Sequence, residues 1–418
     1  GFLTDDELAD PPEFDPHRVD YGRAIDYKHS LLKKAFARWK QDQAGLSAEY
    51  EDFLDANEFW LEDYVLFMAA KAEHGGVIWT DWDPEIAQRT NLPAWREKLA
   101  DTMDYERFIQ FMFFHQWHSV KRYANEKGVK LIGDIPLFIA YDSSDLWANR
   151  ELFSVDENGD LYAVAGVPPD YFSATGQLWG NPLYEWDKMK ADDFAWWRKR
   201  FRQTLKMADI IRIDHFRGLE AYWRISGGET TAMNGEWIKA PGDELFSTVQ
   251  EYLGEVPIIA EDLGVITPEV EALRDKFGFY GIKILQFSFG TGMEEKFLPH
   301  RHIQHCIVHT GSHDNDTTAA YFEKARNDGD NDIAQFAEEY LKPAEGESLC
   351  EAVVRASYAS VADASVLPVQ DVLGLGNEAR MNFPGKIGGW WSWRCTWDQL
   401  SDELAASQRR LSELYGRI

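Results

Sequence analysis

The sequence predicts an α/β protein of the TIM (β/α)8-barrel type with helical and loop insertions. Three apolar runs end in acidic residues, at Asp214, at Glu261 and Asp262, and at Asp314, and each interval has room for a strand, a helix and loops. In a parallel β/α barrel the side chains at the strand ends meet at one open mouth. The acids are therefore expected to converge on one cleft, and 418 residues are enough for such a barrel.

Composition excludes some classes of partner. The chain carries 71 acidic and 43 basic residues, a formal net charge of −28, which argues against nucleic acid and anionic membranes as partners. Aromatic residues make up 14% of the chain and include 17 Trp. Such side chains stack on sugar rings, but they also fill cores, so composition permits a carbohydrate ligand without establishing one.

The cysteines and the first residues bear on location. The three cysteines, Cys306, Cys350 and Cys395, form no CxxC pair and predict neither a disulfide framework nor a zinc site. The chain begins with an acidic segment that lacks a signal-peptide pattern, and no apolar stretch reaches bilayer-spanning length. We expect a cytoplasmic protein with no membrane partner.

The chain begins with two regions that precede the barrel. Residues 1–29 are polar and contain prolines, as a connecting segment does. Between residues 30 and 128 the apolar periodicity is helical, and we expect a helical insertion subdomain whose aromatic side chains form its core. The catalytic barrel portion follows over residues 129–418. Its first strand is expected at residues 129–138 and carries Asp134.

The rest of the barrel portion alternates strands with helices. Residues 139–190 form a long irregular stretch rich in Gly, Pro, Asp and aromatic residues, which we interpret as a lid loop. Further strands are predicted at residues 281–289 and 365–373, with a closing helix at 399–415. Six barrel strands are counted, two short of a closed barrel, so we expect the barrel to be incomplete, with its first two strands absent.

The strand that ends at Asp214 also carries Arg212. Side chains alternate along a strand, so these two residues share one face. A guanidinium two residues from a carboxylate favours the ionised form, which suits a nucleophile or a fixed negative charge. A single Arg-x-Asp pair is more often an ordinary buried ion pair, so the catalytic interpretation depends on the other acids.

Two facing carboxyl groups about 5 Å apart are the apparatus of retaining glycoside hydrolysis and transfer. Asp214 suits the nucleophile, while the acid/base needs a raised pKa, which the apolar residues 257–260 favour at the end of their strand. Glu261 and Asp262 point to opposite faces, so only one can enter the cleft. The spacing does not say which.

The acidic segment at residues 313–316 also permits a metal cluster. Hard-cation sites need more oxygen ligands, and no EF-hand spacing is present. Asp316 is equally explained as a helix N-cap. The chain has no GxGxxG or P-loop signature, so nucleotide chemistry is unsupported and no metal is expected.

Several motifs resemble those of the 4-α-glucanotransferases, the amylomaltases or disproportionating enzymes of the α-amylase clan. The motifs lie at residues 166–182 (GVPPDYFSATGQLWGNP), 211–218 (IRIDHFRG), 260–264 (AEDLG), 310–317 (TGSHDNDT) and 380–385 (RMNFPG). The similarity runs in order across essentially the whole chain.

This resemblance implies a retaining mechanism with Asp214 as nucleophile, Glu261 as acid/base and Asp314 as a third acid that stabilises the transition state. It places four residues at the donor glucose subsite: Asp134, Arg212, His313 and Asn382. It implies three substrate contacts in the lid loop: Asp170, Tyr171 and Trp179. The implied substrates are maltooligosaccharides and α-1,4-glucans, with glucose or a maltodextrin as acceptor and no metal or organic cofactor.

Two alternatives stand beside the transferase. One is an α-1,4-glucan hydrolase of the same clan, and the other is a truncated, non-catalytic glucan-binding remnant. Members of the family carry a longer N-terminal region with the first two barrel strands, and an open barrel exposes strand edges. The lid loop and the motif variants argue against the hydrolase. The presence of all three acids argues against an evolved binding role, but not against inactivity caused by missing strands.

Overall fold

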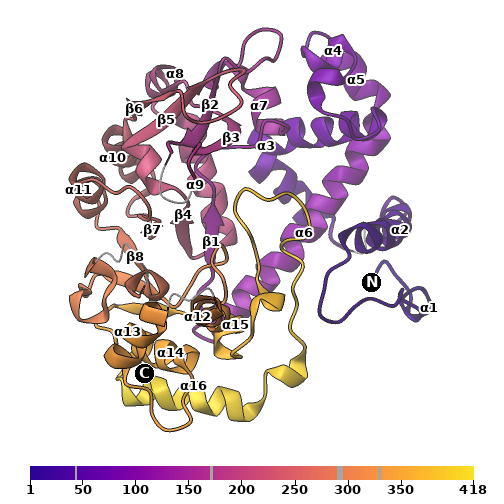
Figure 1. The fold of residues 1–418 in the computed structure, drawn as a ribbon. Helices are drawn as coiled ribbons and strands as arrows, with labels where there is room; N and C mark the ends of the chain where they lie inside the picture. The colour runs from indigo at the N-terminus through magenta and orange to yellow at the C-terminus, as the bar shows by residue number, and fades with distance from the viewer. Residues whose placement is uncertain (43–44, 170–172, 290–294, 328–330) are drawn as a thin grey trace. The chain divides into compact units, whose positions relative to one another are not determined.

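The computed structural model describes residues 1–42, 45–169, 173–289, 295–327 and 331–418 (Figure 1). These residues form two compact units. The first unit comprises residues 1–10 and 28–279, and the second unit comprises residues 11–27 and 280–418. Each unit contains three parallel β-strands and the helices that follow them, so the chain is a mixed α/β protein.

The helical prediction for residues 30–128 is confirmed. The helices are α2 (Tyr21–Trp39), α3 (Ser47–Glu73), α4 (Pro84–Ala87), α5 (Leu92–Lys98) and α6 (Ala100–Glu126). Their aromatic residues form a core in which the rings of Trp39 and Phe108 are buried and 5.6 Å apart. These aromatic side chains stabilise the helices by packing, as the periodicity indicated.

The first unit contains a parallel sheet in the order β1–β4–β7. Its strands are β1 (Ile132–Ile135), β4 (Ile210–Ile213) and β7 (Ile258–Ala260). The helices α9 (Ala195–Met207), α10 (Gly242–Leu253) and α11 (Pro268–Lys276) accompany them. Asp134 pairs in register with Arg212, and Ile213 with Ala260. Asp214 and Glu261 therefore follow the carboxyl ends of adjacent strands.

A second, antiparallel sheet was not predicted. It has the order β3–β2–β5–β6 and consists of β2 (Ala163–Val167), β3 (Gln177–Pro182), β5 (Ala221–Ser226) and β6 (Gly235–Lys239). The expectation that residues 139–190 are irregular is wrong, because this segment contains β2 and β3 and also α7 (Ser144–Ala148) and α8 (Trp186–Ala191).

The close approach of β2 and β3 requires a glycine. At Gly166 a Cβ would lie 2.3 Å from the Gln177 carbonyl oxygen, so the two strands could not lie this close if residue 166 had a side chain.

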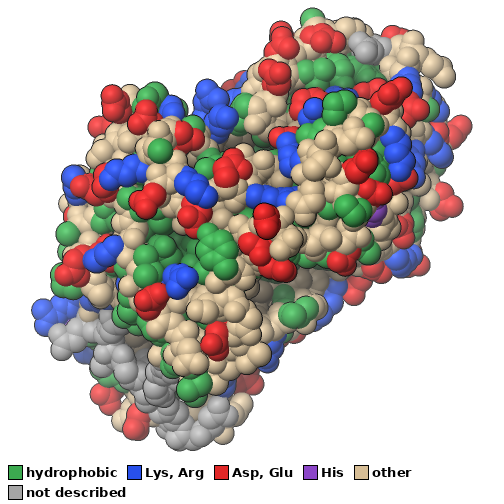
Figure 2. All heavy atoms as spheres, turned by 90° about the horizontal axis from the view of Figure 1, so that it is seen from above, with side chains coloured by type: hydrophobic (Ala, Val, Ile, Leu, Met, Phe, Trp, Pro, Cys, Tyr) green, Lys and Arg blue, Asp and Glu red, His purple; other side chains and the backbone are tan. Residues whose placement is uncertain are grey.

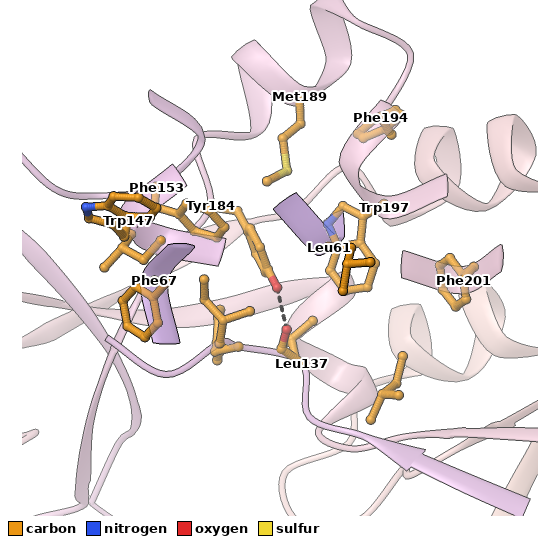
Figure 3. Close-up of a cluster of buried hydrophobic side chains, with 14 of the residues drawn as sticks. Leu61, Phe67, Leu137, Trp147, Phe153, Tyr184, Met189, Phe194, Trp197 and Phe201 are labelled. Atoms are coloured by element: carbon orange, nitrogen blue, oxygen red, sulfur yellow. Dashed lines mark hydrogen bonds between the residues drawn. The ribbon is translucent and has the colours of Figure 1, made fainter. Parts of the chain in front are cut away.

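Buried aromatic rings hold this segment in the first unit (Figure 3). The Tyr184 hydroxyl donates a 2.6 Å hydrogen bond to the Leu137 carbonyl, just after β1. The ring of Tyr184 lies 5.5 Å from that of Phe153 and 5.3 Å from that of Trp197. Arg200 donates to the same Leu137 carbonyl at 3.1 Å. The loop after β1 is thereby tied to the segment that leads into α9.

The second unit contains the parallel strands β8 (Tyr280–Ile284), β9 (Cys306–His309) and β10 (Ala364–Val366), with β9 between the other two. Its helices include α12 (Thr318–Asn327), α13 (Asn331–Leu341), α14 (Leu349–Ala359) and α16 (Asp402–Leu414). The last of these confirms the predicted closing helix. All six predicted parallel strands are therefore found.

Three of these strands are shorter than predicted. The strand expected at residues 129–138 spans only Ile132–Ile135. The strand expected at residues 281–289 ends at Ile284. The strand expected at residues 365–373 ends at Val366 and is followed by α15 (Val369–Val372). The buried Asp371 carboxylate accepts hydrogen bonds at 2.7 Å from the backbone N–H and the hydroxyl of Thr318. These bonds stabilise the helical turn at this point, so the apolar run does not continue as a strand.

On the face shown in Figure 2, acidic side chains are interspersed with Lys and Arg. The acidic excess of the sequence is therefore not gathered into one patch on that face. This arrangement is typical of a solvated surface.

The last residues of the chain stabilise the end of α14. The Arg417 guanidinium donates to four backbone carbonyls, those of Ser357, Tyr358, Ser360 and Ala362, at 2.8 to 3.2 Å. Carbonyls at a helix C-terminus lack partners within the helix. Arg417 supplies the missing donors.

We predict that Arg417→Met destabilises the second unit by about 3 kcal/mol, because these partly buried carbonyls lose charged donors. Urea unfolding followed by circular dichroism measures the effect. Arg409→Met is the control, since the Arg409 side chain is 74% exposed and pairs with Glu413 one helical turn away. Equal midpoints for the two variants would contradict the capping role.

Candidate active site

Arg212 lies between two carboxylates at the carboxyl ends of β1 and β4. Its Nη1 donates to Asp134 Oδ1 at 2.6 Å and lies 3.0 Å from Asp214 Oδ1. Burial lowers the pKa of Arg212, but the charges of Asp134 and Asp214 outweigh this effect and raise the pKa overall. The guanidinium therefore stays charged, and a cation at this distance favours the carboxylate form of a neighbouring acid. The side chain of Asp214 remains 44% exposed.

The Glu261 carboxyl is held by backbone amides directly after β7. The His215 N–H donates to Oε2 at 2.8 Å, and the Leu263 N–H donates to Oε1 at 2.9 Å. Burial and the nearby charge of Asp214 raise the pKa of Glu261 to about 8, against the opposing effects of Arg212 and the two amides. Glu261 is therefore protonated at neutral pH, as a general acid must be.

Asp262 is directed into a different environment. It is 4% exposed, and its Oδ2 lies 2.5 Å from Arg274 Nη1 in α11. A buried carboxylate paired in this way is a structural element. The choice that the sequence left open is thereby resolved, because Glu261 is the acid that lies beside Asp214 and Arg212.

Trp179 approaches the same group of residues from β3. Its ring is 37% exposed and meets the ring of His215 edge-on, with centroids 4.8 Å apart and planes at 84°. Phe138, which follows β1, lies 6.5 Å from both rings. The other two predicted lid contacts, Asp170 and Tyr171, lie outside the described residues.

The second unit gathers Asp314, His313 and Asn382 into one network. Asp314 Oδ1 accepts a 2.6 Å hydrogen bond from the Asn382 side chain, and Oδ2 lies 3.2 Å from His313 Nε2. The Asn382 N–H donates to the His313 carbonyl at 3.0 Å. Arg380 donates to the Asp314 carbonyl at 2.7 Å and also pairs with Asp316. The Asp314 carboxylate is therefore fixed in orientation.

Trp391 extends this network with an exposed aromatic ring. Its centroid lies 5.0 Å from that of His313. Its carbonyl accepts a 2.6 Å hydrogen bond from the hydroxyl of Tyr21, in the segment predicted to be a connector. Arg380, Trp391 and His215 were not predicted from the sequence as site residues. Two of them stand in motifs that carry the resemblance, which is the signal that could have found them.

Two features are not found in the part of the chain that the structure describes. No group of three or more His, Cys, Asp or Glu side chains is arranged there to hold a metal ion. No helix there is long and apolar enough to cross a membrane.

A carboxylate beside an arginine and a buried carboxyl group with a raised pKa follow adjacent parallel strands, and enzymes of the β/α-barrel class that act on glycosidic bonds use such a pair of acids. A family model described as 4-alpha-glucanotransferase matches residues 2–400. The chain belongs to the 4-alpha-glucanotransferase family. The transferase interpretation is thereby supported over the hydrolase and the non-catalytic remnant.

Individual relatives agree with the family match. The 4-alpha-glucanotransferase of Synechocystis sp. is 47% identical, over 100% of this chain and 83% of that protein. The enzyme of the same name from Thermus thermophilus is 45% identical, over 97% of this chain and 83% of its own length. The solved structure of an amylomaltase from Streptococcus agalactiae in complex with acarbose matches with a TM-score of 0.94 and 36% identity, over 99% of this chain and 84% of that one. The TIM-type barrel fold predicted from the sequence is thus supported.

We predict that Glu261→Gln raises stability at alkaline pH while abolishing activity. The raised pKa means that folded protein binds this proton more tightly than unfolded protein does, so stability falls as pH rises from the ordinary value of 4.5 through about 8. The amide does not ionise, so this loss disappears. Thermal unfolding at pH 5 and pH 8.5 measures the difference, with exposed Glu251→Gln as the control. Identical pH dependence in Glu261→Gln and the parent would contradict the shift.

Proposed function

We propose that this enzyme transfers α-1,4-glucan segments between maltooligosaccharides by retaining double displacement, with Asp214 as nucleophile and Glu261 as acid/base. The observation that carries the proposal is the pair of environments at the strand ends. Arg212 keeps Asp214 charged, while burial and that same charge keep Glu261 protonated. Two carboxyl groups with opposite protonation states are what the first step requires.

In the first step an Asp214 oxygen attacks the anomeric carbon of the donor, and the glycosidic oxygen leaves with the proton from Glu261. The covalent glycosyl ester removes the negative charge of Asp214. One cause of the raised pKa of Glu261 then disappears, while Arg212 and the two amides continue to favour the carboxylate. Formation of the intermediate thereby prepares Glu261 to act as a base.

In the second step a hydroxyl of the acceptor sugar attacks the anomeric carbon and gives its proton to Glu261. The bond to Asp214 breaks, and its carboxylate returns to Arg212. Configuration is retained because the carbon is inverted twice. A transferase differs from a hydrolase here only in excluding water as the acceptor.

Further substrate contacts are assigned by the family motifs. We assign Asp314 to the sugar hydroxyls and to stabilisation of the oxocarbenium-like transition state, supported by its fixed orientation between Asn382 and His313. Asp134 and Arg212 are assigned to the donor glucose, and Trp179 to stacking on a sugar ring. Asp170 and Tyr171 stay predictions.

We propose maltooligosaccharides and α-1,4-glucans as donors and glucose or a maltodextrin as acceptor. The names of the relatives, and the acarbose complex of the Streptococcus agalactiae amylomaltase, support this substrate class. The proposed chemistry needs neither metal nor organic cofactor, since both proton transfer and nucleophilic attack are supplied by side chains. We place the enzyme in the cytoplasm, where reducing conditions would keep its three cysteines as free thiols.

The proposed transfer reaction predicts a particular pattern of products from maltotriose. Incubation with maltotriose is expected to yield glucose together with a ladder of longer maltodextrins. Asp214→Asn should lower the rate at least about a thousandfold, because the amide is a poor nucleophile, while maltotriose binding measured by calorimetry persists. Glucose and maltose without a ladder would instead indicate hydrolysis. An active Asp214→Asn variant would exclude Asp214 as nucleophile.

The proposed role of Glu261 also predicts how activity depends on pH. Because Glu261 must donate a proton, kcat/KM for maltotriose should fall as pH rises through about 8. Among the described residues, Asp214 and Arg212 are the charged groups that act on Glu261. A profile that stays flat to pH 9.5 would show that Glu261 is not the acid.

A further inference from the structure

His215 is linked to both proposed catalytic acids, because it is next to Asp214 in the sequence and its backbone N–H contacts Glu261. It follows Asp214 directly and adopts the left-handed conformation, with φ 53° and ψ 45°. This conformation costs a residue with a Cβ about 1 kcal/mol or more, and it persists only where surrounding contacts hold it. Such backbone strain is concentrated at functional sites.

The backbone of His215 contacts the acid/base residue. Its N–H donates to Glu261 Oε2 at 2.8 Å. The next N–H, that of Phe216, donates to the Glu261 carbonyl at 3.2 Å. The turn after β4 therefore holds both the carboxyl group and the main chain of Glu261. A change in the φ of His215 would reorient the first of these donors.

The ring of His215 contacts the proposed stacking residue. It meets the ring of Trp179 at 4.8 Å and 84°, a favourable edge-to-face geometry. Its Nε2 is buried and has no hydrogen-bond partner among the described residues. Burial lowers the pKa of His215 to about 3, so the ring is neutral at working pH. At Gly218 a Cβ would lie 3.0 Å from the ring of His215, so a side chain at that residue would crowd the ring.

We infer that His215 is a positioning residue with two separable parts. Its left-handed backbone aims the N–H that fixes Glu261, and its ring fixes the plane of Trp179 for stacking on a bound glucose unit. The inference rests on the proposed function, because it explains how the proposed acid/base, Glu261, and the proposed sugar contact, Trp179, are held in position. If the ring of His215 only filled space, its removal would not affect the function of Trp179.

Two variants separate the ring from the backbone. Asn and Gly both adopt the left-handed conformation readily, so His215→Asn and His215→Gly should keep the N–H to Glu261 while losing the ring. We expect kcat to stay within about threefold and the alkaline limb of kcat/KM to stay at the same pH. We expect KM for maltotriose to rise about tenfold, since Trp179 loses its support. Asp214 and Arg212, which face Glu261, are unchanged in both variants.

A double-mutant cycle tests the contact between the rings. Trp179→Ala should raise KM by a similar factor, and His215→Asn combined with Trp179→Ala should be no worse than either alone. The same cycle in an Asp214→Asn background, with maltotriose binding measured by calorimetry, gives a readout that does not need turnover. Thermal unfolding checks that each variant is folded.

Two results would overturn the inference. Additive effects of the two substitutions would show that the ring of His215 does not act through Trp179. A large loss of kcat with a displaced alkaline limb in both His215→Asn and His215→Gly would show that the ring, and not the backbone, serves Glu261. Failure of the proposed function is distinguishable, because the unmodified enzyme would then produce no maltodextrin ladder.

Discussion

The placement of the Glu261 carboxyl group beside the charged Asp214 is the constraint on which the rest of the site depends. Two backbone amides and Arg212 favour the carboxylate form of Glu261, while burial and Asp214 favour the acid, and the second set prevails. The balance depends on the charge of Asp214, which the proposed mechanism removes when Asp214 forms an ester. In that mechanism the same residues serve as acid in the first step and as base in the second.

Environment rather than residue type separates the roles of the three acids at the ends of β4 and β7. Asp214 and Glu261 share a partly exposed site with Arg212, whereas Asp262, next in sequence, is buried against Arg274. Side-chain alternation placed Glu261 and Asp262 on opposite faces, as the sequence predicted. The position of Arg274 in α11 determines that Asp262 is the buried acid and that Glu261 lies beside Asp214. The pattern of residues along a strand carries no information about that position.

The parallel strands were predictable because their signal is local: a short apolar run, followed by an acid in the strands that end at Asp214, Glu261 and Asp314. The antiparallel sheet was not, because β2 pairs with β5 across a long stretch of intervening sequence and its strands contain Gly166 and Gly235. Residues that looked irregular acquire their structure from distant partners. The same reason applies to residues 369–372. These residues form a helix and not a strand, and the backbone N–H of Thr318, far away in the sequence, donates a hydrogen bond to Asp371 within it.

Within the site, residue identity was predictable to the extent that the chemistry requires a particular side chain. The networks around Asp214, Glu261 and Asp314 consist largely of predicted residues. His215 differs, because its part in the site follows from its φ angle and from a contact with β3. The motif at residues 211–218 contains His215, but neither its φ angle nor its contact with β3 can be seen in the sequence.

The antiparallel sheet also has a consequence for biosynthesis. The β2–β3 hairpin joins neighbouring segments and can form soon after both have left the ribosome. The other edge of β2 must wait for β5, since Ala163 pairs with Ser226 and all of β4 is made in between. An unpaired strand edge is a template for association with other chains. Newly made chains are therefore expected to be most prone to aggregate in the interval between synthesis of β3 and synthesis of β5, and chaperone dependence should be greatest there.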